Sequence, residues 1–303
     1  MVFENFNKLI NKVKNNQEKK RVAVVCAGDE HTLEAVFLAK RDGIVNPILI
    51  GDSEKIKGIL SNQKNEIDHE NIIHADSMEE AAKCGVDLIR ENKADYLMKG
   101  KIDTSKLLKA VVSKESGLRT GSVMSHVAFL EIPTYKKLLV VTDGGMVMYP
   151  TLEEKKGIVE NAVRTLKLIG YEKPKVAALC AVEKVNPKME ETVHAKELKD
   201  MSLNGKIEDC IIEGPISYDL VMSKKSARIK GFESPIVEEA DILLMPNIAT
   251  GNIVSKSLIY SANAKMAGIV VGAKVPIVLT SRGSSTEEKY LSLVLSSAMD
   301  KGE

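Results

Sequence analysis

Six short segments of the sequence combine glycine with hydroxyl, amide or charged residues, and most of them follow a run of apolar residues. They are residues 27–31 (AGDEH), 99–105 (KGKIDTS), 143–146 (DGGM), 213–215 (EGP), 246–252 (PNIATGN) and 281–285 (SRGSS). In open α/β sheets, ligands bind beyond the carboxyl ends of the strands, where helix N-termini present free N–H groups and a positive dipole end. These segments therefore predict an anion site at the carboxyl ends of several strands.

The segment 280–286 (TSRGSST) has the composition of a phosphate-binding turn. It follows the apolar run 276–279 and opens a predicted helix. Arg282 can hold two phosphate oxygens at once, which a lysine cannot do, and the helix dipole adds to the attraction. The alternative is that the serines only cap the helix and that Arg282 is a solvated surface charge.

Glu287 and Glu288 stand just inside this last helix. Ser285 and Glu288 have the spacing of a capping box, which explains Glu288 without any catalysis. Either carboxylate would act as a general base for a thiol or phosphate proton only if it faced the site. Both interpretations stay open from the sequence.

Lys99, Lys101 and Arg119 flank a helix that is predicted to begin at Thr104. They form a second cationic group for phosphate or for the phosphates of a nucleotide-like ligand, although a solvated surface is the commoner place for such charges.

Asn247, Thr250 and Asn252 lie where the apolar run 241–245 ends and a helix begins, so they donate hydrogen bonds to a ligand or cap the helix. His126 lies in the apolar run 123–130. In such a run, a histidine that packs in the core is commoner than one that binds a ligand.

Short β-rich runs alternate with amphipathic stretches, which is typical of an α/β protein with a largely parallel sheet. The predicted strands are residues 21–27, 47–51, 95–98, 123–132, 137–142, 175–182, 209–213, 241–246 and 275–280. The clearest helix begins at Thr151 with a capping box to Glu154 and ends at Gly170. Others run from Thr104 to about Ser116, after Asn252, and from near Ser284.

The 303 residues suggest about two domains. We find no long linker and no internal repeat, so short crossings should join the domains. The segment 117–122 (GLRTGS) is the best candidate for one crossing, because glycines bracket a cationic turn between a helix and a strand.

Composition and missing motifs exclude several classes of protein. The 43 Lys and Arg against 42 Asp and Glu leave no positive excess for nucleic acid, and no stretch of about 18 uncharged apolar residues predicts a membrane span. The four scattered cysteines predict neither a metal site nor disulfides, which fits a cytoplasmic protein. The motifs GxGxxG, GxxxxGK[ST], GxSxG and HExxH are all missing from the sequence. Their absence counts against a Rossmann dehydrogenase, a P-loop enzyme, a serine hydrolase and a zincin, respectively.

The order of motifs resembles the phosphate acetyl/butyryl transferase family, and within it the short butyryltransferase branch. The segments that carry the resemblance are residues 97–105 (LMKGKIDTS), 117–121 (GLRTG), 125–127 (SHV), 142–146 (TDGGM), 213–215 (EGP), 246–253 (PNIATGNI) and 281–283 (SRG). The segments lie between residues 97 and 283, and the resemblance itself spans nearly the whole chain.

The resemblance implies two α/β domains of the isopropylmalate dehydrogenase-like architecture with a cleft between them. Residues 1–122 plus 279–303 would form the first, discontinuous domain and residues 123–278 the second. It also implies an acyltransferase reaction, in which phosphate directly attacks butanoyl-CoA in a ternary complex to give butanoyl phosphate and CoA. Acyl-CoA and phosphate are then the substrates, no cofactor or metal is needed, and the chain forms a homo-oligomer.

Ser281 and Arg282 are the expected catalytic pair, with Glu287 and Glu288 as candidates for moving the thiol proton. The expected residues for binding phosphate and CoA are Lys99, Lys101, Thr104, Ser105, Arg119, Thr120, His126, Asp143, Asn247, Thr250, Gly251, Asn252 and Gly283.

The sequence departs from the family pattern at a few positions and leaves other functions open. The acetyl branch has an Asp shortly after Ser-Arg where this chain has Glu287 and Glu288, and Val147 stands where many relatives have Asn. The alternatives are an acetyl, propionyl or branched acyl preference, a decarboxylating dehydrogenase of the same architecture, and a noncatalytic protein that binds CoA or acyl phosphate.

Overall fold

The computed structural model describes residues 2–281 and 283–299. Their contacts divide the chain into two compact units, each built from helices and strands. The first unit comprises residues 7–122 and 267–299, and the second unit comprises residues 2–6 and 123–266. The expected mixed α/β fold is confirmed.

The divisions along the chain follow from the pairing of a few strands. One lies between residues 122 and 123, directly after the segment that we expected to be a crossing. The return falls between residues 266 and 267, earlier than the expected boundary at 278/279. Strand β10 (Lys265–Val271) accounts for the difference, because Val270 pairs with Ile277 of β11 (Ile277–Val278) and the Gly268 N–H donates to Ser292 Oγ at 2.9 Å.

Residues 2–6 also lie outside the unit in which the sequence analysis expected them. The Phe3 N–H donates to the Tyr171 hydroxyl at 3.1 Å, the Leu138 N–H donates to the Phe3 carbonyl at 2.8 Å, and Phe3 is buried. These contacts attach the N-terminal segment to the second unit.

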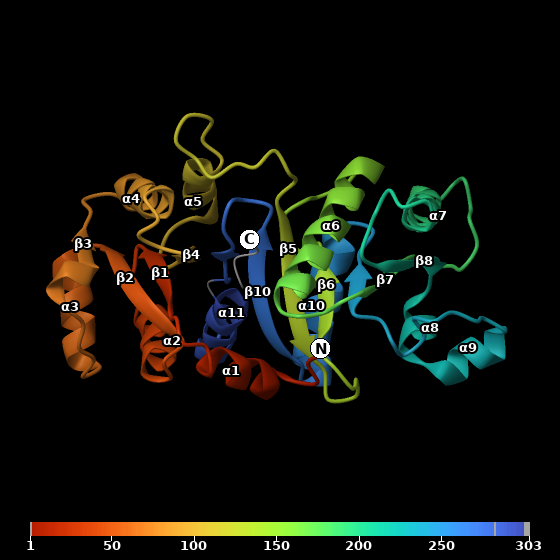
Figure 1. The fold of residues 1–303 in the computed structure, drawn as a ribbon, viewed down its shortest axis with the longest axis horizontal. Helices are drawn as coiled ribbons and strands as arrows, with labels where there is room; N and C mark the ends of the chain where they lie inside the picture. Colours follow the sequence, from red (N-terminus) through yellow and green to blue (C-terminus); the bar gives the residue numbers. More distant parts are fainter. Residues whose placement is uncertain (1, 282, 300–303) are drawn as a thin grey trace. The chain divides into compact units, whose positions relative to one another are not determined.

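The first unit contains a largely parallel sheet in the order β3-β2-β1-β4-β11-β10, in which β10 alone of these described strands runs antiparallel to its neighbour β11 (Figure 1). Its other strands are β1 (Lys20–Val25), β2 (Val45–Gly51), β3 (Ile72–His74) and β4 (Tyr96–Lys99). Its helices are α1 (Phe6–Lys14), α2 (Glu30–Arg41), α3 (Ser53–Asn62), α4 (Met78–Arg90), α5 (Thr104–Val111) and α11 (Thr286–Ala298), with a short 3-10 helix η1 (His69–Asn71). The first residue of α1, Phe6, belongs to the second unit. Helix α11 packs against α2, while α4 packs against α5 (Figure 1).

The second unit contains five strands in the order β5-β6-β9-β7-β8 (Figure 1). Strands β6 (Leu139–Thr142), β9 (Ile242–Leu244), β7 (Lys175–Leu179) and β8 (Ile211–Ile216) are parallel, and β5 (Ser125–Glu131) is antiparallel to β6. Its helices are α6 (Leu152–Leu168), α7 (Glu190–Leu203), α8 (Tyr218–Met222), α9 (Lys224–Lys230) and α10 (Ile248–Ala262). The strands are nearly continuous apolar runs because both faces of such a sheet are covered.

Side-chain caps set where the helices begin. Thr151 and Glu154 form the predicted capping box at α6, and Ser285 caps α11 as predicted. Helix α10 begins at Ile248, earlier than predicted, with Asn247 as its cap. Helix α5 ends at Val111 rather than near Ser116, because the following residues turn back and the Leu118 N–H donates to the Val111 carbonyl at 2.7 Å. None of the helices described here is both long and apolar enough to cross a membrane.

Candidate active site

A pocket of about 460 Å³ opens in the first unit at the carboxyl ends of β1, β4 and β11, and we call it the first-unit pocket. It is lined by Asp29, Thr32, Met78, Lys99, Gly100, Lys101, Ile102, Asp103, Thr280, Ser281 and Lys289. Lys99 and Lys289 are buried, and Lys101 is exposed. Three lysines beside two aspartates give this pocket a positive balance, which favours an anionic ligand.

The turn after β4 places two of these lysines by packing tightly against the end of β1. The Gly100 N–H donates to the Val25 carbonyl and the Lys101 N–H to the Cys26 carbonyl, both at 2.8 Å. A Cβ at Gly100 would lie 2.3 Å from the Cys26 oxygen, so only glycine permits this approach. The close contact holds Lys99 and Lys101 at the pocket.

Asp29 is occupied as the cap of α2. Its carboxylate accepts from the Thr32 N–H at 2.9 Å and also from the Thr32 hydroxyl. Burial acts to raise the pKa of Asp29, but the Thr32 hydrogen bonds and the charges of Lys289 and His31 lower it below its ordinary value. Asp29 is therefore an ionised structural group rather than a proton donor.

Of the four expected catalytic residues, Ser281 lines the pocket, and Arg282 lies outside the described residues. Glu288 is occupied at the start of α11, where its N–H donates to Ser285 Oγ at 3.1 Å and its Oε1 accepts from Ser284 Oγ at 2.6 Å. Burial raises the pKa of Glu288, although the Ser284 bond and Lys289 oppose the shift. Glu287 is exposed, and neither glutamate is among the residues that line the first-unit pocket.

The segment 117–121 (GLRTG) is part of the loop that follows α5. The Thr120 hydroxyl donates to the Gly272 carbonyl at 2.6 Å, and Arg119 forms a backbone bridge with Ala273 and is exposed. Gly283 is also exposed, and its N–H donates to Ser281 Oγ at 3.4 Å. None of these three described candidates lines the first-unit pocket.

Thr104 and Ser105 form the first turn of α5 and also lie outside the lining of the first-unit pocket. Asp103, the residue before them, lines it instead. The N-cap residue thus reaches the pocket, whereas the two expected hydroxyl residues stand one and two residues further along the helix.

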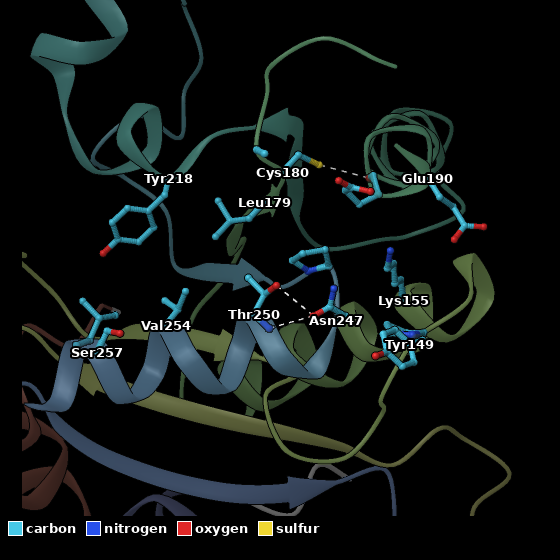
Figure 2. A pocket seen from close by; sticks show the side chains of 15 residues that line it. Tyr149, Lys155, Leu179, Cys180, Glu190, Tyr218, Asn247, Thr250, Val254 and Ser257 are labelled. Carbon is cyan, nitrogen blue, oxygen red and sulfur yellow. Dashed lines mark hydrogen bonds between the residues drawn. The ribbon is translucent and has the colours of Figure 1, made fainter. Parts of the chain in front are cut away.

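A second pocket of about 600 Å³ lies wholly within the second unit, and we call it the second-unit pocket. It is lined by Tyr149, Pro150, Lys155, Leu179, Cys180, Ala181, Glu190, Glu191, Tyr218, Pro246, Asn247, Thr250, Val254, Ser257 and Leu258. Asn247 Oδ1 caps α10 by accepting from the Thr250 N–H and hydroxyl at 3.0 and 3.1 Å (Figure 2). Both expected residues line the pocket while they hold the helix start.

Asp143 organises the turn beside the start of α10. The residue is 2% exposed, and its carboxylate accepts the N–H groups of Gly145, Met146 and Val147 at 2.7, 2.9 and 3.1 Å. The peptide bond between Thr142 and Asp143 is cis. Asp143 is thus a structural residue of the turn rather than part of the pocket lining.

Gly251, Asn252 and His126 belong to the same cluster. A Cβ at Gly251 would lie 2.5 Å from the Asp143 carbonyl oxygen, and the Asn252 amide donates to the Gly144 carbonyl at 3.3 Å. Burial lowers the pKa of His126, although the charge of Asp143 opposes this. Gly251 permits the close approach of α10 to the turn and Asn252 bonds to it, while His126 lies beside Gly145 of the turn; none of these three expected binding residues lines the second-unit pocket.

Sequence reasoning missed Thr32, Lys289 and Lys155. Thr32 follows a segment that we had selected for its composition, so a capping pattern from Asp29 was a usable signal. Lys289 and Lys155 are 5% exposed, and nothing in the sequence distinguishes them from surface lysines.

Within residues 2–281 and 283–299, no three His, Cys, Asp or Glu residues are grouped so as to hold a metal ion. The four cysteines are free thiols.

Comparison with known proteins decides the family. The model of the phosphate acetyl/butaryl transferase family matches residues 72–297. The chain belongs to this family. The resemblance inferred from the motifs is therefore confirmed.

The relatives of this phosphate acetyl/butaryl transferase family member are acyltransferases by name. A phosphate butyryltransferase of Clostridium acetobutylicum is 44% identical, over 97% of each chain. A phosphate acetyltransferase of Thermotoga maritima is 42% identical, over 91% of this chain and 94% of the relative. The crystal structure of a branched-chain phosphotransacylase from Enterococcus faecalis is 34% identical with a TM-score of 0.80, covering 92% of this chain and 98% of that one.

Proposed function

We propose that this protein transfers a butanoyl group between CoA and inorganic phosphate, so that butanoyl-CoA and phosphate give butanoyl phosphate and CoA. The proposal rests on the family and on one observation, the first-unit pocket in which Lys99, Lys101 and Lys289 gather with Ser281 at the carboxyl ends of three strands. Such a pocket suits phosphate because cations, a hydroxyl and a nearby helix N-terminus attract the same dianion.

In the proposed mechanism, bound phosphate attacks the thioester carbonyl directly and the thiolate leaves. Lys99 and Lys101 hold the phosphate together with Arg282, and Ser281 donates a hydrogen bond to the carbonyl oxygen or the sulfur. Binding energy then serves mainly to orient the two substrates, and the positive groups stabilise the charge that develops. The cleft between two domains and the isopropylmalate dehydrogenase-like arrangement are part of this proposal and come from the resemblance.

Neither expected glutamate lines the first-unit pocket, so protonation of the leaving thiolate by either one requires its side chain to turn toward the substrates; of the two, Glu288 is the better candidate. Burial raises the pKa of Glu288, so its carboxyl group holds a proton more readily than an exposed glutamate does.

Release of free thiol from a series of acyl-CoA thioesters tests the proposal. The series runs from acetyl to hexanoyl with branched members, each assayed with and without phosphate and with a chelator. Phosphate-dependent release that is greatest for butanoyl-CoA and resists the chelator is the expected result. No release from any thioester would refute the transferase, and tight CoA binding without turnover would indicate a noncatalytic binding protein.

Two relatives favour specific alternatives for the acyl group. The Thermotoga maritima relative is named an acetyltransferase, and the Enterococcus faecalis structure is named a branched-chain phosphotransacylase. One methylene changes discrimination by only about 1 to 3 kcal/mol, so the same series must rank acetyl, propionyl and branched thioesters.

We also propose a homo-oligomer located in the cytoplasm. Helix α10 is rich in apolar residues, yet of its described residues only Gly251 is buried, while Ile253 and Tyr260 are 64% and 80% exposed. Such a face suits a second copy of the chain. Light scattering should report more than one chain per particle, and fewer in an Ile253→Ser/Tyr260→Ser variant.

The proposed cytoplasmic location is supported by the four free thiols, which suit a reducing compartment.

A further inference from the structure

Lys155, near the start of α6, is a lysine that burial separates from water without giving it a carboxylate partner. It is 5% exposed and lines the second-unit pocket. Among the residues that the structure describes, no carboxylate oxygen lies within 4 Å of its Nζ. Burial lowers the pKa of Lys155, while Cys180, Glu190 and Glu191 act in the opposite direction. A larger share of this amine is therefore neutral and nucleophilic than in an exposed lysine.

His194 of α7 is placed to accept a proton from this amine. Its Nδ1 lies 3.1 Å from Lys155 Nζ, within the reach of a general base, and its Nε2 lies 3.9 Å from Glu190 Oε1. We infer the tautomer with the proton on Nε2, because Nδ1 then accepts and Nε2 faces a carboxylate. Burial and the charge of Lys155 lower the pKa of His194, while Glu190 and Glu197 oppose this, so the neutral imidazole is favoured near neutral pH.

The second-unit pocket has an apolar end and a reactive end. In the view of Figure 2, Leu179, Val254 and Tyr218 lie toward one side, and Lys155 and Glu190 lie toward the other. An acyl chain fits against the apolar side chains while its activated carbonyl group reaches the amine.

We propose that Lys155 is a site of self-acylation, at which its ε-amino group takes a short acyl group from an acyl phosphate and becomes an Nε-acyl-lysine. The proposal rests on the proposed function, which supplies the acyl phosphate as a product. The neutral amine attacks the carbonyl carbon, the new C–N bond forms, and the C–O bond to phosphate breaks with its electron pair leaving on the phosphate. The proton that the nitrogen loses passes to His194 Nδ1.

The thiol of Cys180 lines the same pocket but does not compete for the acyl group. Burial raises the pKa of Cys180 to about 12, and its Sγ donates to the Glu191 carbonyl at 3.4 Å. Because the thiolate is the reactive form, Cys180 is inert near neutral pH.

Lys156 provides a matched control in the same chain. It is the next residue of α6, its side chain is 30% exposed, and its Nζ lies 3.6 Å from Glu160. A protease that cleaves after glutamate releases residues 155–160 (KKGIVE) as one peptide. Fragment-ion mass spectrometry of this peptide therefore compares the two lysines in a single spectrum.

The experiment incubates the full-length protein with synthetic butanoyl phosphate over a range of pH and measures acylation of each lysine with time. At about pH 7, Lys155 should be acylated at least about fivefold faster than Lys156, because each unit by which a pKa falls raises the neutral fraction about tenfold. The ratio should decrease as the pH rises, because once most of Lys155 is neutral a further rise in pH adds little to its reactive share. Equal rates at every pH would overturn the proposal.

Two variants test the roles of the attacking amine and of the general base separately. Lys155→Arg should remove the adduct at position 155 and leave labelling of Lys156 unchanged. His194→Gln should slow acylation of Lys155 at least about tenfold and spare Lys156. Thermal unfolding checks both folds, and the pH-dependent ratio in the unsubstituted protein tests the proposal without any variant. Equal acylation of Lys155 in the His194→Gln variant would overturn the assigned base.

A second donor and a parallel assay separate the possible failures. Butanoyl-CoA without phosphate should label Lys155 more slowly than butanoyl phosphate, and faster labelling would overturn the assigned donor. Because the acyl phosphate is added as a reagent, labelling does not require turnover. Thiol release measured on the same preparation therefore shows whether the proposed transferase reaction fails while self-acylation stands, or the reverse.

Discussion

Replacing Asp143 by asparagine tests whether this residue builds the site or binds the substrate. The buried carboxylate accepts three backbone N–H groups, two at Oδ1 and one at Oδ2. Asparagine has one carbonyl oxygen, so an NH₂ group would face the Val147 N–H and that hydrogen bond would be lost. The loss costs about 1.5 to 3 kcal/mol for a charged acceptor, and the two remaining bonds weaken because their acceptor becomes neutral.

Relief from burying a charge offsets part of this cost. We therefore expect Asp143→Asn to lower the free energy of unfolding by about 2 kcal/mol. Urea unfolding followed by circular dichroism measures it. The matched control is Asp200→Asn, because Asp200 is 45% exposed and its pair with Lys196 at 2.6 Å should contribute less than about 1 kcal/mol.

The opposite pattern would refute the reasoning. The free energy of unfolding of Asp143→Asn would then lie within about 0.5 kcal/mol of that of the unsubstituted protein, while KM for phosphate or CoA would rise. Such a result would make Asp143 a substrate ligand and not a structural residue.

Three further substitutions test the surroundings of the two pockets. Gly251→Ala should lower the free energy of unfolding by about 1 to 3 kcal/mol, because the added Cβ would lie 2.5 Å from the Asp143 carbonyl oxygen. The control is Gly58→Ala in α3, whose Cβ would meet no atom within 4 Å and which should raise the free energy of unfolding by about 0.5 to 1 kcal/mol. Equal effects of the two substitutions in urea unfolding would contradict this. Burial lowers the pKa of His126, so the unfolded chain binds this proton more readily, and the protein should lose stability relative to His126→Gln as pH falls through about 6.5; parallel stability curves would show that no such linkage exists. Lys289→Met should raise KM for phosphate about tenfold by removing a buried charge from the first-unit pocket, while the same change at exposed Lys109 should not; initial-rate kinetics decide between them.

Local signals in the sequence were sufficient for several elements. The capping boxes and serine caps predicted where α6 and α11 begin, because a cap is satisfied by a residue three positions away. Strand β10 was missed, since it follows an apolar helix closely and only two residues separate them, Asn263 in the left-handed conformation and Ala264. The start of α5 at Thr104 was predicted correctly, but its end near Ser116 was wrong, because the end at Val111 depends on the chain turning back rather than on the helix pattern.

The candidate site divides in the same way. Glycine-rich turns at strand ends predicted Lys99, Lys101, Ser281, Asn247 and Thr250, and the structure places each of these in the lining of a pocket. The expected binding residues Asp143, Gly251 and Asn252 instead support a turn, because side chain or backbone groups already occupy their surroundings.

The sequence by itself determined the family, the alternation of helices and strands, and the turns at which ligands can bind, since these depend on residue type and short spacing. Only the tertiary structure decided that Lys289 and Lys155 are buried at pockets while similar lysines lie in water. Burial depends on which distant segments pack together, as when α7 brings His194 to Lys155. The environment of a side chain, and with it its charge and reactivity, is a property of the folded chain and not of its own neighbours in sequence.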